Sequence, residues 1–418
     1  MRKIKIIFAL TLLLSLIINI NGQRTVTTKT LKKDLFKSMI ENMVAPSVMG
    51  YQFVLIKDGK IVAEGADGKA RTGTDGDLEM TTSTPQNIGS LAKFLAGTAM
   101  INLFEKPAAK ADRDYKKNGL QGNLNRPVWG EFPKVWLDAI PGPNILGNTQ
   151  RKITYRQLLQ HRSGFDEDWK SMKKLNNFLS MLTGEFNYTL YNKRKYANMN
   201  FTLGGYLLPL VEYHNLNFDL DIETGKLDAT DADKIVRDRL GKRMDALMRE
   251  RLWNKMSPKF NITCDAKKDV KNTGAYGYKS KQEKGGGMFD SMIEQNGHCV
   301  GSGGYFTSAR DFANYVAHFS ATDLIVTDAG RDAMYKEGMP ADERIVWTGA
   351  TQDDWIAANF KQSRVAWSNG ASDGNRTVLL QLPDNYYLIL FTTSPELSVG
   401  DLFKIGTLAF KEGMKHNF

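Results

Sequence analysis

Cysteine and histidine are both scarce in this chain of 418 residues. There are two cysteines, Cys264 and Cys299, and five histidines, and none of them follow the ligand spacing of a zinc site. This scarcity argues against a metal centre and against a small fold held by disulfides. If the two cysteines pair in an oxidising compartment they tie down the glycine-rich segment 285–287, and the sequence leaves that pairing open. We expect no metal and no other cofactor.

Long apolar runs are missing after residue 20. Residues 6–20 are apolar and follow Arg2, Lys3 and Lys5, a pattern typical of a secretory signal peptide. We expect residues 1–22 to be this signal and residues 23–418 to form a single domain. No later stretch is apolar enough to cross a bilayer, so we expect a secreted or periplasmic protein without stable membrane insertion.

The chain also lacks repeats, long linkers and a concentrated basic patch. Three of the 56 lysines and arginines lie in residues 1–22, which leaves an excess of about seven positive charges over the 46 acidic residues. The short charged runs at 110–117 and 279–284 are mixed in character and are typical of solvated loops. Nothing here indicates binding to DNA or RNA, and we expect a small molecule or a peptide as the partner.

What the chain does have is a serine and a lysine three residues apart, at the start of an apolar helix. The spacing of large apolar side chains predicts a helix over 92–104. Residues three apart share a helix face, so the amine of Lys93 can reach the hydroxyl of Ser90. A lysine in an apolar environment favours the neutral amine, which can take a proton from the serine and so make it a nucleophile. Taken alone, this pattern is more often that of a helix cap followed by a solvated lysine.

Two further polar motifs adjoin regular segments later in the chain. The sequence Tyr-Ala-Asn at 196–198 precedes an apolar helical run at 201–211, and Ser-Asn-Gly at 368–370 follows the start of a strand at 365. By itself, each of these is as readily a buried aromatic or a turn as a functional group. Their order after the serine–lysine pair indicates that the three motifs belong to one functional site.

In this order the three motifs resemble those of the serine β-lactamase and penicillin-binding-protein family, which are Ser-x-x-Lys, Tyr-x-Asn and Lys-Thr-Gly or His-x-Gly. Residues 153–165, ITYRQLLQHRSGF, and residues 301–311, GSGGYFTSARD, are similar to two more segments of that family, with Thr307 in place of a serine. The resemblance covers roughly residues 45–410. It is greatest to the class C branch, which also holds esterases, D-aminopeptidases and DD-peptidases.

Strand patterns lie at both ends of the chain, whereas the middle is mostly helical. Asp58-Gly59 is a strong turn signal within a hairpin at 51–65, and residues 365–392 contain further strands. We therefore expect an α/β fold in which both chain ends build one antiparallel sheet. Helices at 30–43 and 399–415 should flank it.

A mostly α-helical region is expected to be inserted into this sheet-containing part, as in the β-lactamase and transpeptidase fold. The α/β part would take about residues 23–100 and 300–418, and the helical part about 100–300. Polar, glycine- and charge-rich segments at 218–233 and 265–289 are expected to be loops bordering a cleft between the two parts.

The resemblance implies catalytic roles for three residues. Ser90 would be the nucleophile, Lys93 the base that takes its proton, and Tyr196 the group that carries a proton to the leaving group. The backbone N–H of Ser90 would also lie at the electropositive end of the helix, where an oxyanion could be held.

The resemblance likewise implies a substrate-binding set. The amide of Asn198 would bind the acyl side chain, and the backbone N–H of Ala371 would complete the oxyanion hole. Gly370 would leave room for a substrate that lies along the strand edge, and Ser368 and Asn369 would border it.

Ser368 departs from the family pattern, because a lysine or histidine opens the third motif in the relatives. A serine hydroxyl supplies a hydrogen bond but no charge for a substrate carboxylate, and Arg364 or Arg376 would be the other sources of that charge. We therefore expect an exported serine hydrolase that forms a covalent acyl-enzyme on an ester, an amide or a D-amino-acid peptide. The alternatives are a penicillin-binding DD-carboxypeptidase or β-lactamase, and a catalytically weak relative that binds a ligand or a partner.

Overall fold

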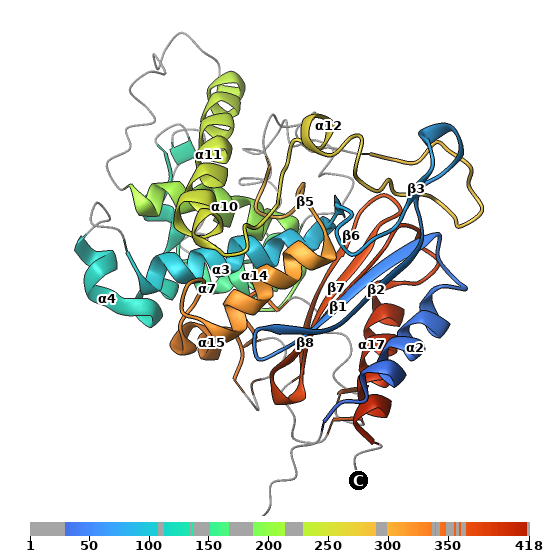
Figure 1. The fold of residues 1–418 in the computed structure, drawn as a ribbon. Helices are drawn as coiled ribbons and strands as arrows, with labels where there is room; N and C mark the ends of the chain where they lie inside the picture. Colours follow the sequence, from blue (N-terminus) through green and yellow to red (C-terminus); the bar gives the residue numbers. More distant parts are fainter. Residues whose placement is uncertain are drawn as a thin grey trace, which may run out of the picture.

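The computed structural model describes residues 30–107, 113–133, 136–137, 151–166, 187–213, 229–289, 299–336, 339, 343–347, 355–356, 359–360 and 365–415. A six-stranded sheet runs through it in the order β3-β2-β1-β8-β7-β6, and each pair of neighbours is antiparallel. Its strands are β1 (Gly50–Lys57), β2 (Lys60–Arg71), β3 (Leu78–Glu79), β6 (Ala366–Ala371), β7 (Arg376–Leu382) and β8 (Tyr386–Thr392). The N-terminal and C-terminal strands β1 and β8 lie side by side at its centre (Figure 1). This confirms the predicted fold class.

The β1–β2 hairpin forms at the predicted turn. Asp58 and Gly59 both have positive φ, 48° and 73°. A two-residue turn with both central residues in this region matches the right-handed twist of the strands, and Asp-Gly is a preferred pair for it. The turn fixes the register of β1, whose alternating side chains then belong to different cores.

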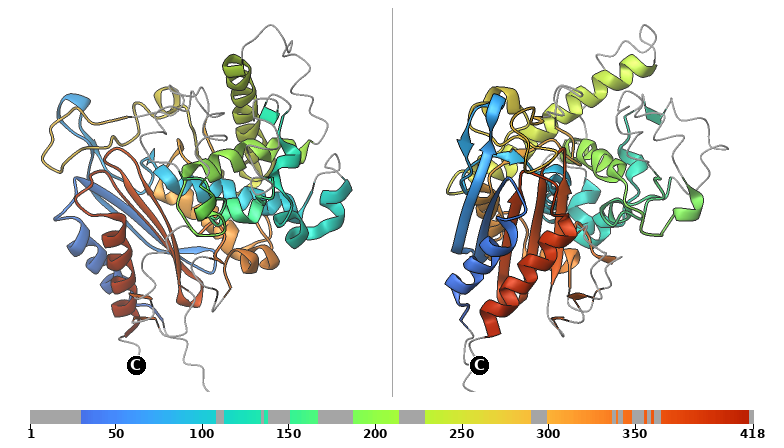
Figure 2. Two further views of the ribbon diagram at one scale, coloured as in Figure 1. Left: turned by 180° about the vertical axis from the view of Figure 1, so that it is seen from behind. Right: turned by 90° about the vertical axis from the view of Figure 1, so that its right-hand side faces the viewer.

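Each face of the sheet carries its own core. On one face Phe53 and Leu55 pack with the helices α2 (Lys33–Val44) and α17 (Val399–Lys415). On the other face Val54 and Ile56 join the core that contains α3 (Ala92–Glu105) and α14 (Ala309–Ala321). Figure 2 shows α2 and α17 lying together against the sheet. The sheet therefore lies between two layers of helices. Successive side chains of a strand point to opposite faces, so each strand contributes to both cores.

The helical part surrounds α3, whose residues from Ala92 to Phe104 are all buried. A helix that is buried on every side has no polar face, which explains its continuous run of apolar and small side chains. The remaining helices and short strands are α4 (Arg113–Leu124), α7 (Tyr155–Leu159), α10 (Asn198–Glu212), α11 (Ala229–Arg251), α12 (Ala266–Asp269), α15 (Asp328–Met334), β4 (Gln86–Asn87) and β5 (Phe306–Thr307).

Both expected loops are partly helical, and α12 lies within the expected loop at 265–289. Residues 229–233 belong to α11, whereas residues 218–228 lie outside the described residues. Asp233, the last residue of that segment, has partners outside it: Arg237 Nε lies 2.8 Å from its carboxylate, which also accepts from Trp136 Nε1 at 3.0 Å. Asp233 and Arg237 are both buried. A buried pair four residues apart stabilises a helix that the composition alone does not indicate.

The two cysteines are free, so the pairing that the sequence left open does not form. Cys299 is buried in the core against which Cys264 packs. The expected signal segment lies outside the described residues. Among the helices that the structure describes, none is both long and apolar enough to span a membrane.

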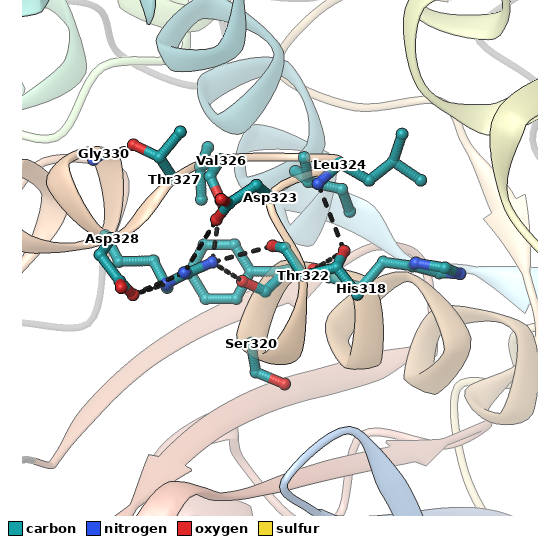
Figure 3. Close-up of polar contacts among 12 residues, drawn as sticks. His318, Ser320, Thr322, Asp323, Leu324, Val326, Thr327, Asp328 and Gly330 are labelled. Atoms are coloured by element: carbon teal, nitrogen blue, oxygen red, sulfur yellow. Dashed lines mark hydrogen bonds and ion pairs between the residues drawn. The ribbon is translucent and has the colours of Figure 1, made fainter.

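The end of α14 and the start of α15 are joined by the side chain of Arg331. Figure 3 shows the segment between the two helices, with Asp323 and Asp328 labelled. Its guanidinium donates to the backbone carbonyls of Phe319 (2.8 Å), Thr322 (3.0 Å) and Val326 (2.8 Å). It also contacts the carboxylates of Asp323 and Asp328, at 3.4 Å and 2.6 Å. One largely buried cation therefore satisfies the carbonyls at the C-terminal end of α14.

Replacing this side chain should destabilise the fold without touching the candidate site. We expect Arg331→Gln to lower the free energy of unfolding by about 2 kcal/mol, because it removes a charged donor from three carbonyls at once. Urea denaturation measures the change. The matched control is Arg310→Gln, which breaks only a surface ion pair with Glu64 and should cost less than about 1 kcal/mol. Equal losses in the two variants would contradict this role of Arg331.

Candidate active site

Ser90 lies in a short 3-10 turn, η2 (Gly89–Leu91), which continues directly into α3. Gly89 has a φ of 52°, and a Cβ atom there would lie 2.8 Å from the backbone of Ala371 in β6. Only glycine fits both the backbone angle and this close approach. The turn is thereby held against the edge strand of the sheet, with the serine at the junction of the two parts of the fold.

Lys93 reaches Ser90 from the next turn, as its spacing predicts. Its Nζ lies 2.9 Å from Ser90 Oγ, 2.6 Å from Asn198 Oδ1 and 3.0 Å from the backbone carbonyl of Ser302. The side chain is fully buried. Three contacts from different segments therefore give Nζ one defined place beside the serine hydroxyl.

Tyr196 approaches the same hydroxyl from the other side. It lies in the extended segment before α10, and its Oη donates to Ser90 Oγ at 2.8 Å and to Asn198 Oδ1 at 3.3 Å. The tyrosine is 44% exposed, whereas Lys93 is completely covered. The serine hydroxyl thus accepts from one buried amine and from one phenol that is open to solvent.

Strand β6 lies against η2 through Gly370. A Cβ atom at Gly370 would lie 2.0 Å from the carbonyl oxygen of Ile88 and 2.7 Å from the backbone nitrogen of Leu91. Thr377 of β7 supports the same contact, because its hydroxyl donates to the Ile88 carbonyl at 2.9 Å. The glycine in this motif is therefore required by the packing of the backbone around Ser90.

The N–H of Ala371 points away from the neighbouring strand. One residue later, the N–H of Ser372 donates to the carbonyl of Asn375 across the β6–β7 hairpin at 3.2 Å. Because successive N–H groups of an extended strand point in opposite directions, that of Ala371 faces the outer edge of β6. The backbone of Ala371 is also the part of β6 that approaches Gly89, the residue before Ser90.

The remaining two predicted residues are placed differently from the serine, lysine and tyrosine. Ser368 is fully buried, so its hydroxyl does not face the solvent. Asn369 is adjacent in the strand and so lies on the same face as Trp367, whose ring packs on Phe403 of α17. By the alternation of the strand, Ser368 therefore lies on the face of β6 that carries Gly370, which packs against the backbone around Ser90, and Asn369 lies on the opposite face.

Arg364 and Arg376 were expected as other sources of the positive charge that Ser368 lacks. Arg364 lies outside the described residues. Arg376 donates to the carbonyls of Ser372 and Asn375, at 3.0 Å and 2.8 Å, and so stabilises its own hairpin.

The structure adds two groups that were given no role from the sequence. One is the carbonyl of Ser302, which orients Lys93. The other is His161, whose ring stacks on Tyr196 with the centroids 4.6 Å apart. Both lie in the segments 301–311 and 153–165, and the resemblance of these segments to the family is the sequence signal that could have identified them.

Comparison with protein families finds one match: residues 36–215 match the family model described as Beta-lactamase. This segment contains Ser90, Lys93, Tyr196 and Asn198. Among curated proteins, none matches the sequence of this chain.

Solved structures with the same fold include three of differing description. FmtA from Staphylococcus aureus is 14% identical, with a TM-score of 0.61 over 91% of this chain and 90% of its own. A class C β-lactamase from Rhodobacter sphaeroides is 12% identical, with a TM-score of 0.57 over 90% and 99%. The D-alanine carboxypeptidase AmpC from Burkholderia cenocepacia is 16% identical, with a TM-score of 0.54 over 89% and 98%. At these identities the likeness concerns the fold.

Proposed function

We propose that the chain is a serine hydrolase of the beta-lactamase family, whose model its residues 36–215 match, and that it works through a covalent acyl-enzyme on Ser90. The observation that carries this proposal is the convergence of Lys93 Nζ and Tyr196 Oη on Ser90 Oγ, at 2.9 Å and 2.8 Å. A nucleophile within hydrogen-bond reach of a base, with the base itself oriented by further partners, is the geometry of nucleophilic catalysis.

In the acylation step, Ser90 Oγ forms a bond to the carbonyl carbon of the substrate while its proton passes to the amine of Lys93. The tetrahedral intermediate then collapses, the bond to the leaving group breaks, and Tyr196 hands its proton to that group and recovers one from Lys93, which is thereby neutral again. Water hydrolyses the resulting ester on Ser90 and returns the free enzyme. The open side of Tyr196 and the buried position of Lys93 suit these two tasks, because the leaving group departs toward solvent.

We assign the oxyanion hole to the backbone N–H groups of Ser90 and Ala371. Gly89 and Gly370 bring the two backbones together, which supports a shared oxygen between them. Removing one such donor from an acyl-transfer enzyme typically lowers turnover on the order of a hundredfold or more. Asn198, whose Oδ1 accepts from Lys93, presents the rest of its amide to the acyl side chain.

The test of this function is covalent labelling of the wild-type protein. A fluorophosphonate or penicillin-type probe followed by intact-mass measurement should show one adduct per chain. Absence of any adduct, together with no turnover of short-chain esters, would favour a relative that binds a ligand or a partner without catalysis.

We propose a neutral ester, amide or D-amino-acid peptide as the substrate class. The position that is lysine or histidine in the family is the uncharged and buried Ser368, and Arg376 is engaged by its own hairpin. A β-lactam or a peptide ending in a free D-alanine carries a carboxylate that needs a cation. These considerations favour an esterase or peptidase over a β-lactamase or DD-carboxypeptidase.

This preference predicts the outcome of a matched substrate pair. A D-amino-acid peptide with an amidated C-terminus should have a higher kcat/KM than the same peptide with a free carboxylate, and a short-chain ester should be hydrolysed faster than a β-lactam. Ser368→Lys should shift the ratio toward the carboxylate substrate about ten- to a hundredfold, since one charged hydrogen bond contributes roughly 1.5–3 kcal/mol. Its matched control is Ser368→Thr, which adds bulk without charge. A wild type that prefers the carboxylate, with a ratio unmoved by Ser368→Lys, would show that substrate charge is recognised elsewhere.

A further inference from the structure

His161 lies directly after α7 in an unusual backbone conformation. Its φ is 57°, and its backbone is held by hydrogen bonds from its own N–H to the carbonyl of Leu158 and from the N–H of Lys195 to its carbonyl. A non-glycine residue in the left-handed region costs conformational energy, so its side chain is held in place by the surrounding contacts. The second of these bonds also ties the histidine to the segment that carries Tyr196.

The histidine ring is neutral and its acceptor nitrogen is in use. Nδ1 accepts from the backbone N–H of Ala197 at 3.3 Å, and Asn200 Nδ2 lies at the same distance. Burial of the ring lowers the pKa of His161 well below its ordinary value, and the positive charges of Lys93 and Arg194 lower it further. A ring of this kind does not exchange protons with substrate at neutral pH, so its contribution has to be geometric.

Its geometric contacts converge on Tyr196. The imidazole stacks on the phenol ring, with the centroids 4.6 Å apart and the planes 30° apart, and the ring of Phe201 also packs on the imidazole, with the centroids 5.1 Å apart. Tyr196 is 44% exposed, so burial alone does not define its orientation. The histidine supports both the ring of Tyr196 and the backbone of the next residue, Ala197.

We propose that His161 is a positioning residue, whose ring and Nδ1 hold Tyr196 so that its Oη stays within hydrogen-bond distance of Ser90 Oγ. This inference rests on the proposed function, because it assigns a task to Tyr196 in acyl transfer. A buried histidine that only supports the core is the competing explanation. The two differ in one respect: positioning acts through the phenol hydroxyl, whereas core support does not.

A double-mutant cycle separates the two explanations. His161→Asn keeps a residue that tolerates positive φ and an acceptor for Ala197, but it removes the stacked ring. His161→Phe keeps an aromatic ring and removes the acceptor. Each is measured with the Tyr196 hydroxyl present and in a Tyr196→Phe background, with kcat and KM for one ester substrate. Thermal unfolding of every variant checks that it folds.

We expect both His161 variants to lower kcat about ten- to a hundredfold, with KM nearly unchanged, because small misplacements of a catalytic group cost rates of this size. In the Tyr196→Phe background, the same substitutions should change kcat less than about twofold. The matched control is His318→Asn, which should leave kcat unchanged. His318 lies on α14, and its ring contacts the backbone carbonyl of Ser257.

Equal losses in both backgrounds would overturn the proposal and leave His161 as a core residue, and so would an unchanged kcat. If His161→Phe fails to fold, His161→Asn alone decides between these outcomes. Failure of the proposed function gives a different result. In that case the wild-type protein is not labelled by the probe and does not hydrolyse the ester, so no variant needs to be compared.

Discussion

Ser90→Ala should abolish covalent labelling and reduce ester hydrolysis on the order of a million-fold, the loss typical when the nucleophile of a serine hydrolase is removed. The hydroxyl is the only attacking atom in the mechanism, and both Lys93 and Tyr196 direct their hydrogen bonds to it. The substitution removes one oxygen from a half-buried turn, so the variant should fold as the wild type does. Intact mass after exposure to the probe measures the labelling, and initial rates measure the hydrolysis.

The matched control is Ser83→Ala, an exposed serine seven positions upstream in the same segment. It should keep full labelling and full turnover. An adduct that persists in Ser90→Ala and maps by peptide mass to another residue would overturn the assignment of the nucleophile.

Lys93→Met should lower the rate of acylation on the order of a thousandfold or more, since positioned general bases contribute roughly 10²–10⁴. Methionine has a similar length and suits the apolar surroundings of α3, so it removes the amine without opening a large cavity. The three acceptors it leaves, Ser90 Oγ, Asn198 Oδ1 and the Ser302 carbonyl, are neutral. Single-turnover measurement of the acyl-enzyme separates this step from deacylation.

Lys57→Met is the control for Lys93→Met, because Lys57 is a partly exposed lysine whose amine contacts Asp58 and the carbonyl of Asp384. It should acylate at the wild-type rate. An unchanged acylation rate in Lys93→Met would mean that another group takes the serine proton. The only other side chain that contacts Ser90 Oγ among the described hydrogen bonds is Tyr196, which would then be the first candidate.

The sheet and its flanking helices were predictable because their signals are local. The turn at Asp58-Gly59 is decided by the backbone freedom of two residues, and the continuous apolar run of β1 reflects its burial on both faces. The start of α11 was not predictable in this way. The carboxylate of Asp233 in its first turns accepts a hydrogen bond from Trp136, which is far away in the sequence. A window of neighbouring residues cannot reveal that contact.

The candidate site also has one part that local sequence spacing predicts and another part that it does not. Ser90 and Lys93 are three residues apart on one helical turn, so the sequence alone brings the nucleophile to its base. Tyr196 and Asn198 were expected beside them from the resemblance, and the structure brings both into hydrogen-bond contact with this pair. The prediction that Ser368 and Asn369 border the substrate was made from the same motif. It stays a prediction, to which the structure adds that Ser368 is buried and that Asn369 lies on the other face of β6.

The sequence by itself determined the reactive groups and the order of the elements that carry them, because helix period, strand alternation and turn chemistry depend on neighbours along the chain. The tertiary structure decided what surrounds those groups. The burial of Ser368, the Ser302 carbonyl that accepts from Lys93 and the histidine beneath Tyr196 all arise where segments more than thirty positions apart pack together. Close packing and hydrogen-bond satisfaction act between such segments through space, and no periodicity in the sequence records them.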